Sequence, residues 1–419
     1  MLLLLTSQAG AAVHYVNVAN SEPSPPYTSW ATAAQIIQDA IDIALPGDHI
    51  LVTNAIYSTG GRAVNGSAVT NRVAITGAFT VESVNGPAVT VIQGWQVPGT
   101  TNGDSAVRCV SLTNGAVLIG FTLTNGATRA SMSELDGTGG GLRCQFEYYG
   151  PMFVSNCIIT GNSAYLLGGG AYRGMLNNCV LSGNSADIGG GCSDSTLINC
   201  TVGGNSARFY GGAYNSILTN CIVYFNGSGN SADSDLHYCC TTPIPLDGSG
   251  RFNNITNAPL FVDLGGGNLR LQSNSPCINS GFNIYAAGTI DLDGLPRISG
   301  GTVDIGAYEF QNPPTLISIA WLLLYGLPID GSADNSDPDS DGLNNWQEWR
   351  AGTDPTNALS ALRLRPPSQV GNDLVVSWES VAGRSYSVER STDLGALPCF
   401  ELLASRVERK ARDERPEGQ

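Results

Sequence analysis

Oxygen-bearing side chains recur at alternate positions in the segment DPDSDGLNNWQE, which runs from residue 337 to residue 348. Carboxylates occupy its first, third, fifth and twelfth positions, an amide its ninth, and glycine its sixth. This is the oxygen-only spacing of an EF-hand loop, which also uses the carbonyl of its seventh residue, so the segment predicts a Ca²⁺ site. The alternative is an acidic linker between domains. The predicted ligands are Asp337, Asp339, Asp341, Leu343 (through its carbonyl), Asn345 and Glu348.

Two other groups of possible metal ligands are weaker candidates. Asp291 opens a DLDG segment and Asp304 follows it, so these carboxylates are a candidate for a second cation or, more simply, form turns. Zinc needs closely spaced Cys and His ligands, whereas His14, His49 and His237 are far apart in the sequence. The sequence therefore favours calcium alone as a cofactor.

A cysteine recurs at a fixed period in the middle of the chain. NCIITGN at residue 156 returns as NCVLSGN at 178, NCTVGGN at 199 and NCIVYFN at 220, in steps of 22, 21 and 21 residues. This period equals one coil of a β-helix, in which residues one period apart stack as columns about 4.8 Å apart. The inward column would be Cys157, Cys179, Cys200 and Cys221, flanked by Ile159, Leu181, Val202 and Val223.

The repeat gives the cysteines and asparagines structural roles. Thiols stacked in register keep their Cβ atoms farther apart than a disulfide allows, so the column thiols are expected to be free. The cysteines outside this column leave pairing open: Cys109, Cys144, Cys239, Cys240 and Cys277. The asparagines at both ends of each copy are expected at corners, because asparagine tolerates the left-handed conformation and stacked amides can hydrogen-bond along the axis.

The elements that position these residues are mostly short strands. Apolar residues at helical spacing between Tyr27 and Pro46 predict one N-terminal capping helix, with no second helix before Asn312. The 52 glycines and the short apolar runs between them predict turns and strands. The fold class is therefore all-β, a parallel β-helix of about a dozen coils.

Charge and hydropathy limit the partners of the protein. The formal net charge of −15 provides no basic stripe, so nucleic acid is not an expected partner. No apolar run is long enough for a transmembrane helix. Residues 1–12 have an apolar run followed by small residues, which is typical of the remnant of a signal peptide, and predict a secreted or cell-surface protein.

The segments GDHILVTNAIYSTGG, SVNGPAVTVIQG and IGFTLTNG, with the cysteine repeats, resemble the pectin-lyase-like right-handed parallel β-helix proteins of bacterial cell surfaces. The resemblance covers residues 13–312 and implies a right-handed β-helix. SPCINSGFN through TIDLDGLPRISGGTVDIGAYEF resembles a choice-of-anchor Q module, at about residues 255–312. That likeness implies a terminal coil or cap with an address to the cell envelope.

The C-terminal part departs in composition from the repeats. Residues 313–359 contain a helix and the acidic loop, which resembles thrombospondin-type-3 and dockerin-like calcium linkers. Residues 360–398 alternate as strands do and resemble part of a fibronectin-type-III-like sandwich. Residues 399–419 are dense in charge and are expected to be a disordered or helical tail.

No catalytic residue can be assigned from the sequence. The charged residues nearest the repeats, Arg173, Asp187, Asp194 and Arg208, are interpreted as solvated turn residues. Six tyrosines are candidates for stacking on sugars, with turn packing as the alternative: Tyr148, Tyr149, Tyr165, Tyr172, Tyr210 and Tyr214. We expect a monomeric, noncatalytic scaffold or adhesin whose partners are extracellular polysaccharide or cell-envelope components. The alternative is a polysaccharide lyase or glycoside hydrolase of the pectin-lyase-like group.

Overall fold

The computed structural model describes residues 11–64, 66–145, 150–244, 251–370, 373–375, 377–379, 381, 386–390 and 401–407. The chain divides into two compact units, Met1–Pro313 and Pro314–Gln419. Among the described residues, the helices are too short or too polar to span a bilayer. The first ten residues, which include most of the predicted signal-peptide remnant, lie outside the described residues.

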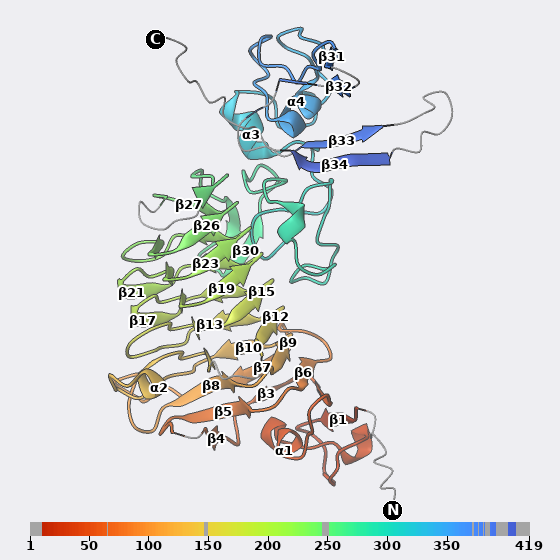
Figure 1. Ribbon diagram of the computed structural model, residues 1–419. Helices are drawn as coiled ribbons and strands as arrows, with labels where there is room; N and C mark the ends of the chain where they lie inside the picture. Colours follow the sequence, from red (N-terminus) through yellow and green to blue (C-terminus); the bar gives the residue numbers. More distant parts are fainter. Residues whose placement is uncertain are drawn as a thin grey trace, which may run out of the picture. The chain divides into compact units, whose positions relative to one another are not determined.

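The first unit is a right-handed parallel β-helix, in which the chain passes through three sheets and returns one coil further along (Figure 1). Sheet A contains β1 (Val13–Val16), β2 (His49–Val52), β6 (Thr80–Ser83), β9 (Val117–Ile119), β12 (Phe153–Ser155), β15 (Met175–Asn177), β19 (Thr196–Ile198), β23 (Ile217–Thr219), β26 (Asp235–His237) and β28 (Arg251–Phe252). The ten described strands are fewer than the dozen coils expected. The chain after β28 leaves the coil path and forms an antiparallel pair, β29 (Phe261–Asp263) and β30 (Asn268–Leu271).

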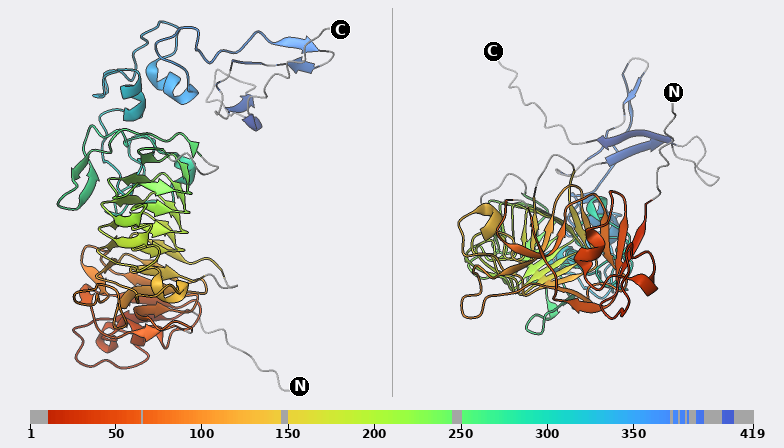
Figure 2. Two further views of the ribbon diagram at one scale, coloured as in Figure 1. Left: turned by 90° about the vertical axis from the view of Figure 1, so that its left-hand side faces the viewer. Right: turned by 90° about the horizontal axis from the view of Figure 1, so that it is seen from below.

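Two shorter sheets complete each coil, and Figure 2 shows the coils stacked on one another. Sheet B contains β3 (Ala55–Tyr57), β7 (Thr90–Gln93), β10 (Thr122–Thr124), β13 (Ile158–Thr160), β16 (Val180–Ser182), β20 (Thr201–Gly203), β24 (Ile222–Tyr224) and β27 (Cys240–Thr241). Sheet C contains β4 (Arg62–Ala63), β5 (Thr70–Ile75), β8 (Val107–Leu112), β11 (Leu142–Cys144), β14 (Ala171–Tyr172), β18 (Cys192–Ser193), β22 (Ala213–Tyr214) and β25 (Ser231–Ala232). A small parallel pair, β17 (Ser185–Ile188) and β21 (Ser206–Phe209), lies in the turns between sheets B and C.

The predicted columns form the core. Ile159, Leu181, Val202 and Val223 pair in register on sheet B and are fully buried. The four repeat cysteines directly precede these strands and are also fully buried. Cys239 extends their column, contrary to expectation, because its neighbour Cys240 pairs with Ile222 one coil earlier. All ten described cysteines are buried free thiols.

The two rows of asparagine have different roles. Asn156, Asn178, Asn199 and Asn220 take positive φ angles between 50° and 53°, as corner residues must. The second row is a ladder, buried except at its last member, in which each side-chain amide donates to the next side-chain carbonyl at 3.0 Å: Asn162, Asn184, Asn205 and Asn226. Only this second row forms the axial amide chain that the sequence predicts.

Two short helices interrupt the strands in the described N-terminal half of the β-helix. α1 (Ile37–Ile41), which follows a 3₁₀ turn, η1 (Trp30–Thr32), buries an apolar face against the first strands. It is shorter than predicted because Ala34 pairs with β1 and donates its amide to the carbonyl of Tyr15 at 2.9 Å. A second helix, α2 (Glu134–Gly137), contradicts the expectation of none before Asn312. Its single turn is too short to produce a hydrophobic period in the sequence.

The segment after β30 lies on the side of the β-helix instead of adding a terminal coil. It contains a 3₁₀ turn, η2 (Asn283–Tyr285). The Asn178 side chain donates to the Ile290 carbonyl at 2.8 Å, and the Asn220 side chain donates to the Phe282 carbonyl at 3.1 Å. Two of the corner asparagines, Asn178 and Asn220, therefore bind the chain's own later segment, which we call the lateral segment (residues 277–310).

Over its described residues, the second unit contains two short helices and two hairpins. α3 (Ile319–Leu324) and α4 (Asn345–Ala351) border a small core that includes Ile317, Leu322 and Ala333. The hairpins are β31 (Ser368–Val370) with β32 (Asp373–Val375), and β33 (Tyr386–Arg390) with β34 (Glu401–Val407). The disordered or helical tail expected from residue 399 is thus wrong over β34, whose Leu and Val residues suit a strand. Residues 408–419 lie outside the described residues.

Candidate metal centre

The acidic loop is shaped by its glycine and by the start of α4. Gly342 has φ of 97°, a conformation that disfavours a Cβ atom, at the sharp bend after the third aspartate. Asn344 caps α4, since its side chain accepts from the amide of Gln347 at 2.9 Å while the Gln347 side chain accepts from the amide of Asn344. This capping box fixes where the loop ends and the helix begins.

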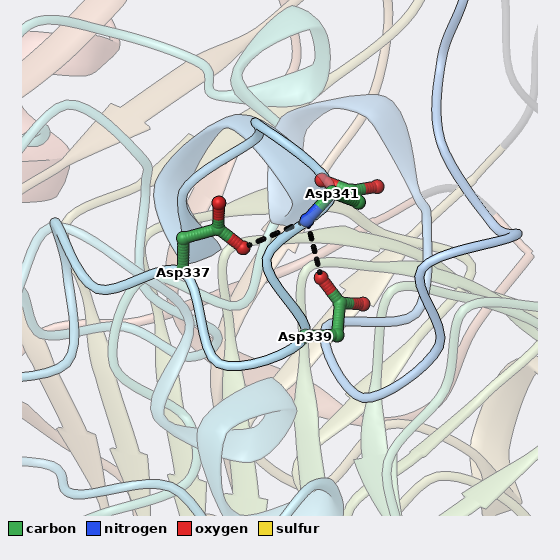
Figure 3. Close-up of side chains that lie close together, drawn as sticks. All are labelled: Asp337, Asp339 and Asp341. Atoms are coloured by element: carbon green, nitrogen blue, oxygen red, sulfur yellow. Dashed lines mark hydrogen bonds between the residues drawn. The ribbon is translucent and has the colours of Figure 1, made fainter.

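Three aspartate side chains point into the loop (Figure 3). Asp337, Asp339 and Asp341 each offer a carboxylate oxygen, and these oxygens all lie within 4.8 Å of one another. The amide of Asp341 donates to Oδ1 of Asp337 at 3.3 Å and to Oδ1 of Asp339 at 3.2 Å. The loop amides therefore hold the carboxylates together despite their like charge.

Glu348 brings a fourth carboxylate to the loop from the first turn of α4. Its side chain is fully buried, and Oε1 accepts from the Thr353 hydroxyl at 3.3 Å. Burial, followed by the charge of Asp339 and then those of Asp341 and Asp337, raises the pKa of Glu348 to about 7. A carboxylate so placed is stabilised by a cation between it and the aspartates.

Several oxygens of the loop are buried without a hydrogen-bond partner. They are Oδ2 of Asp339, Oδ2 of Asp341, Oε2 of Glu348 and Oδ1 of Asn345. Buried polar atoms without partners are costly, and four in one loop need a common explanation. A hard cation accepts only oxygen donors of this kind, so the residues present fit a calcium ion.

The two remaining predicted ligands are held differently. The Asn345 side chain is anchored by its nitrogen, which donates to the Ala333 carbonyl at 2.9 Å and leaves the oxygen unpartnered. Leu343 lies in the loop, where its amide donates to Oδ1 of Asp341 at 2.7 Å. The structure therefore brings the three aspartates together, with Glu348 close enough for their charges to raise its pKa, while Asn345 also connects the loop to the chain before it.

The carboxylates of the second candidate cation group, Asp291 and Asp304, accept hydrogen bonds from backbone amides of the protein itself. Oδ1 and Oδ2 of Asp304 accept from the amides of Asn279 and Phe310, both at 2.7 Å. Asp291 accepts from the amides of Asp293 at 3.0 Å and Glu309 at 2.9 Å. These bonds support the simpler interpretation, in which the aspartates shape turns of the lateral segment.

Sequence reasoning missed a charged cluster on the outside of sheet C. Arg173 donates two hydrogen bonds to the Glu134 carboxylate, at 2.7 and 3.3 Å, and lies over the Tyr172 ring. Arg143 lies 3.6 Å from the same carboxylate, with a side chain only 2% exposed. Glu134 belongs to α2, whose single turn gave no sequence signal, so nothing in the sequence linked the three charged residues.

The remaining charged and aromatic residues that the sequence analysis singled out are mostly paired, stacked or buried. Arg208 and Asp187 lie 4.0 Å apart at the surface, and Asp194 accepts from the Asn215 side chain at 2.5 Å. Tyr210 stacks on Tyr214, with ring centroids 5.9 Å apart, and Tyr172 is buried. Tyr165 is exposed, whereas Tyr148 and Tyr149 lie outside the described residues.

Comparison with known proteins finds no matching family model and no matching curated protein. Solved structures that match include the pectate lyase Pel9A, with a TM-score of 0.39, 12% identity, and coverage of 73% of this chain and 97% of that chain. A pectin methylesterase in complex with a hexasaccharide matches with a TM-score of 0.31, 16% identity, and coverage of 60% and 73%. A rhamnogalacturonan lyase matches with a TM-score of 0.31, 12% identity, and coverage of 59% and 64%.

Proposed function

We propose that the chain is a secreted or cell-surface β-helix scaffold, noncatalytic, with one calcium-binding loop and with extracellular polysaccharide or envelope components as partners. The observation that carries the calcium proposal is the set of four buried, unpartnered side-chain oxygens between residues 339 and 348. Carboxylates of Asp337, Asp339, Asp341 and Glu348, the Leu343 carbonyl and the Asn345 side-chain oxygen would hold the ion. Calcium would neutralise the carboxylates and join α4 to the loop before it.

Calcium is favoured over magnesium by the type of ligand set. Carboxylates spread over a flexible loop, with a glutamate able to bind through both oxygens, suit the larger coordination sphere of Ca²⁺. Mg²⁺ requires near-ideal octahedral geometry and retains water. We therefore expect Ca²⁺ to bind more tightly than Mg²⁺ to the intact chain.

The calcium proposal is tested by calorimetric titration of the intact, chelator-treated chain. Wild type is expected to bind about one Ca²⁺ with a dissociation constant no weaker than about 10⁻³ M. Asp341→Asn should weaken binding strongly. The control Asp330→Asn should not, because Asp330 is exposed outside the loop and bonds only to Ser332 among the described contacts. Absence of calcium heat at millimolar concentration would refute the site.

The scaffold proposal is supported by the lateral segment, which covers part of the outer face of sheet B. Val180, Thr201 and Ile222 form an outward row on sheet B that the repeat alone would leave open to solvent. All three are buried, and the amide of Ala307 in the lateral segment donates to the Thr201 hydroxyl at 3.0 Å. A face covered by the chain's own segment is unavailable to a polymer substrate.

One observation favours the enzyme alternative. Glu134, Arg143 and Arg173 converge from α2 and two coils, and a carboxylate beside arginines is a usable acid–base group. The discriminating experiment is a release assay on uronic-acid and neutral polysaccharides, comparing wild type with Glu134→Gln and the surface control Glu22→Gln. The scaffold proposal predicts no product. Turnover that Glu134→Gln abolishes and Glu22→Gln retains would establish the lyase or hydrolase instead.

A further inference from the structure

The outward row on sheet B ends in a cysteine. Strand pairing places Thr201, Ile222 and Cys240 on successive coils, and all three side chains are buried. The lateral segment covers the row residue by residue: Ala307 bonds to Thr201, and a Cβ atom on Gly306 would come within 2.8 Å of Ile222 Cδ1. The amide of Gly306 also donates to the Asn220 carbonyl at 2.9 Å, in the coil that directly precedes the coil of Cys240.

A second cysteine is held beside the part of the lateral segment that covers this row. The amide of Ile305 donates to the carbonyl of Cys277 at 3.0 Å, and the Cys277 side chain is fully buried. Burial, and then the neighbouring Cys277 thiol, raise the pKa of the Cys240 thiol well above its ordinary value. Burial raises the pKa of Tyr224 in β24 too, and the charges of both cysteines add to this effect.

We propose that Cys240 and Cys277 form a disulfide that joins the last coil of sheet B to the lateral segment. The oxidant would be a disulfide of the glutathione class. The deprotonated sulfur of one cysteine attacks it and releases one glutathione thiolate, and the second cysteine thiolate then attacks the mixed disulfide and releases the other. Both released thiolates take up a proton, so two cysteine thiols are oxidised and one glutathione disulfide is reduced.

The burial of both thiols determines when the bond can form. Because its pKa is raised, the Cys240 thiol provides little thiolate, which is the attacking species, so exchange in the folded protein should be slow. The bond would form during folding, before the lateral segment covers the row. It would then restrict the unfolded chain between residues 240 and 277 and keep the segment on the β-helix.

The column cysteines are poor competitors for this bond. Cys239 lies next to Cys240 in sequence but faces the interior, where its thiol donates to the Leu218 carbonyl at 3.4 Å. Residues stacked in register remain about 4.8 Å apart, beyond the usual Cβ separation of a disulfide. Cys239 and Cys240 are adjacent in sequence but face opposite sides of the sheet, so Cys239→Ser is a matched control for Cys240→Ser.

The test is oxidative refolding of the whole chain in reduced and oxidised glutathione, followed by alkylation and non-reducing peptide mapping. Cleavage after Arg208, Arg251, Arg270 and Arg297 places Cys240 and Cys277 on different peptides. We expect these peptides to be cross-linked in wild type and in Cys239→Ser, and separate in Cys240→Ser. Reduction of the wild type should also lower its unfolding temperature by several degrees.

The wild-type map decides the outcome even if a variant fails to fold. Recovery of Cys240 and Cys277 as alkylated free thiols, in protein with native circular dichroism, would overturn the proposal. Loss of the cross-link in Cys239→Ser and its retention in Cys240→Ser would also overturn it, because the pairing cysteine would then be Cys239.

Discussion

At the scale of single residues, Glu348 has the clearest conflict between its chemistry and its surroundings. It is an acid without exposed surface, with one unpartnered oxygen and three aspartates nearby. Hydrogen bonding to Thr353 satisfies only its other oxygen. A bound cation would change this carboxylate from a destabilising group into a ligand.

Glu348→Gln should therefore have opposite effects with and without calcium. In calcium, the variant should lose at least about tenfold in affinity, about 1.4 kcal/mol, because a charged ligand is gone. In chelator, the second unit should become more stable, because the repulsion with the aspartates is gone. Calcium titration and chemical denaturation followed by tryptophan fluorescence measure the two effects. Equal destabilisation in both conditions would assign Glu348 a purely structural role.

The surroundings of Glu309 predict that the stability of the first unit depends on pH. It is buried beside Arg297 and Asp304, and burial followed by the Asp304 charge raises its pKa to about 9. A carboxyl whose folded pKa is raised contributes its full stability below its unfolded pKa of about 4.3, and this contribution is lost as pH rises through about 9. The free energy of unfolding of this unit should therefore fall between pH 5 and pH 9.

The corresponding variant is Glu309→Gln, which keeps one side-chain oxygen to accept from Arg297 and the Asp304 amide and loses the acceptor of the Ser299 amide. Urea unfolding at pH 5, 7 and 9 should give a flatter dependence on pH than in wild type. Glu22→Gln, an exposed change in the same unit, removes the same charge and should retain the wild-type slope. Parallel slopes for all three proteins would contradict the role of Glu309.

At the scale of elements, the asparagine ladder connects one coil to the next. Asn184 accepts from the amide of Asn162 at 3.0 Å and donates to the Ile159 carbonyl at 2.8 Å and to Asn205. Asn184→Ala should cost about 2–4 kcal/mol in the free energy of unfolding, because it leaves more than one buried polar group unpaired. Asn85→Ala, which removes an exposed amide, should change it by less than about 0.5 kcal/mol.

The features that the sequence predicted are those that repeat or that lie within one short stretch of the chain. Core columns, such as the one that contains Ile159 and Leu181, could be predicted because residues one fixed period apart in the sequence stack on successive coils. The acidic loop could be singled out because its oxygen-bearing residues lie close together in the chain, and its binding of calcium stays a prediction. The lateral segment could not be predicted, since its contact between Ala307 and Thr201 joins residues far apart in sequence with no shared period. The Glu134 cluster was missed for the same reason.

At the scale of the whole molecule, the two compact units should respond differently to calcium. The proposed ligands all belong to Pro314–Gln419, whereas the β-helix core belongs to Met1–Pro313. Because a ligand stabilises only the structure that binds it, calcium should raise the unfolding temperature of the second unit and leave that of the β-helix unchanged. Scanning calorimetry with calcium and with chelator tests this, and an equal shift of both transitions would contradict it.

The proposed calcium site in the acidic loop is tested most directly by an anomalous difference map from crystals of the intact chain grown in calcium. The claim predicts one peak inside the acidic loop, with oxygens of Asp337, Asp339, Asp341 and Glu348 about 2.3–2.6 Å from it. A map with no peak there, at calcium concentrations that saturate solution binding, would contradict the claim. So would a peak placed at Asp291 and Asp304 instead.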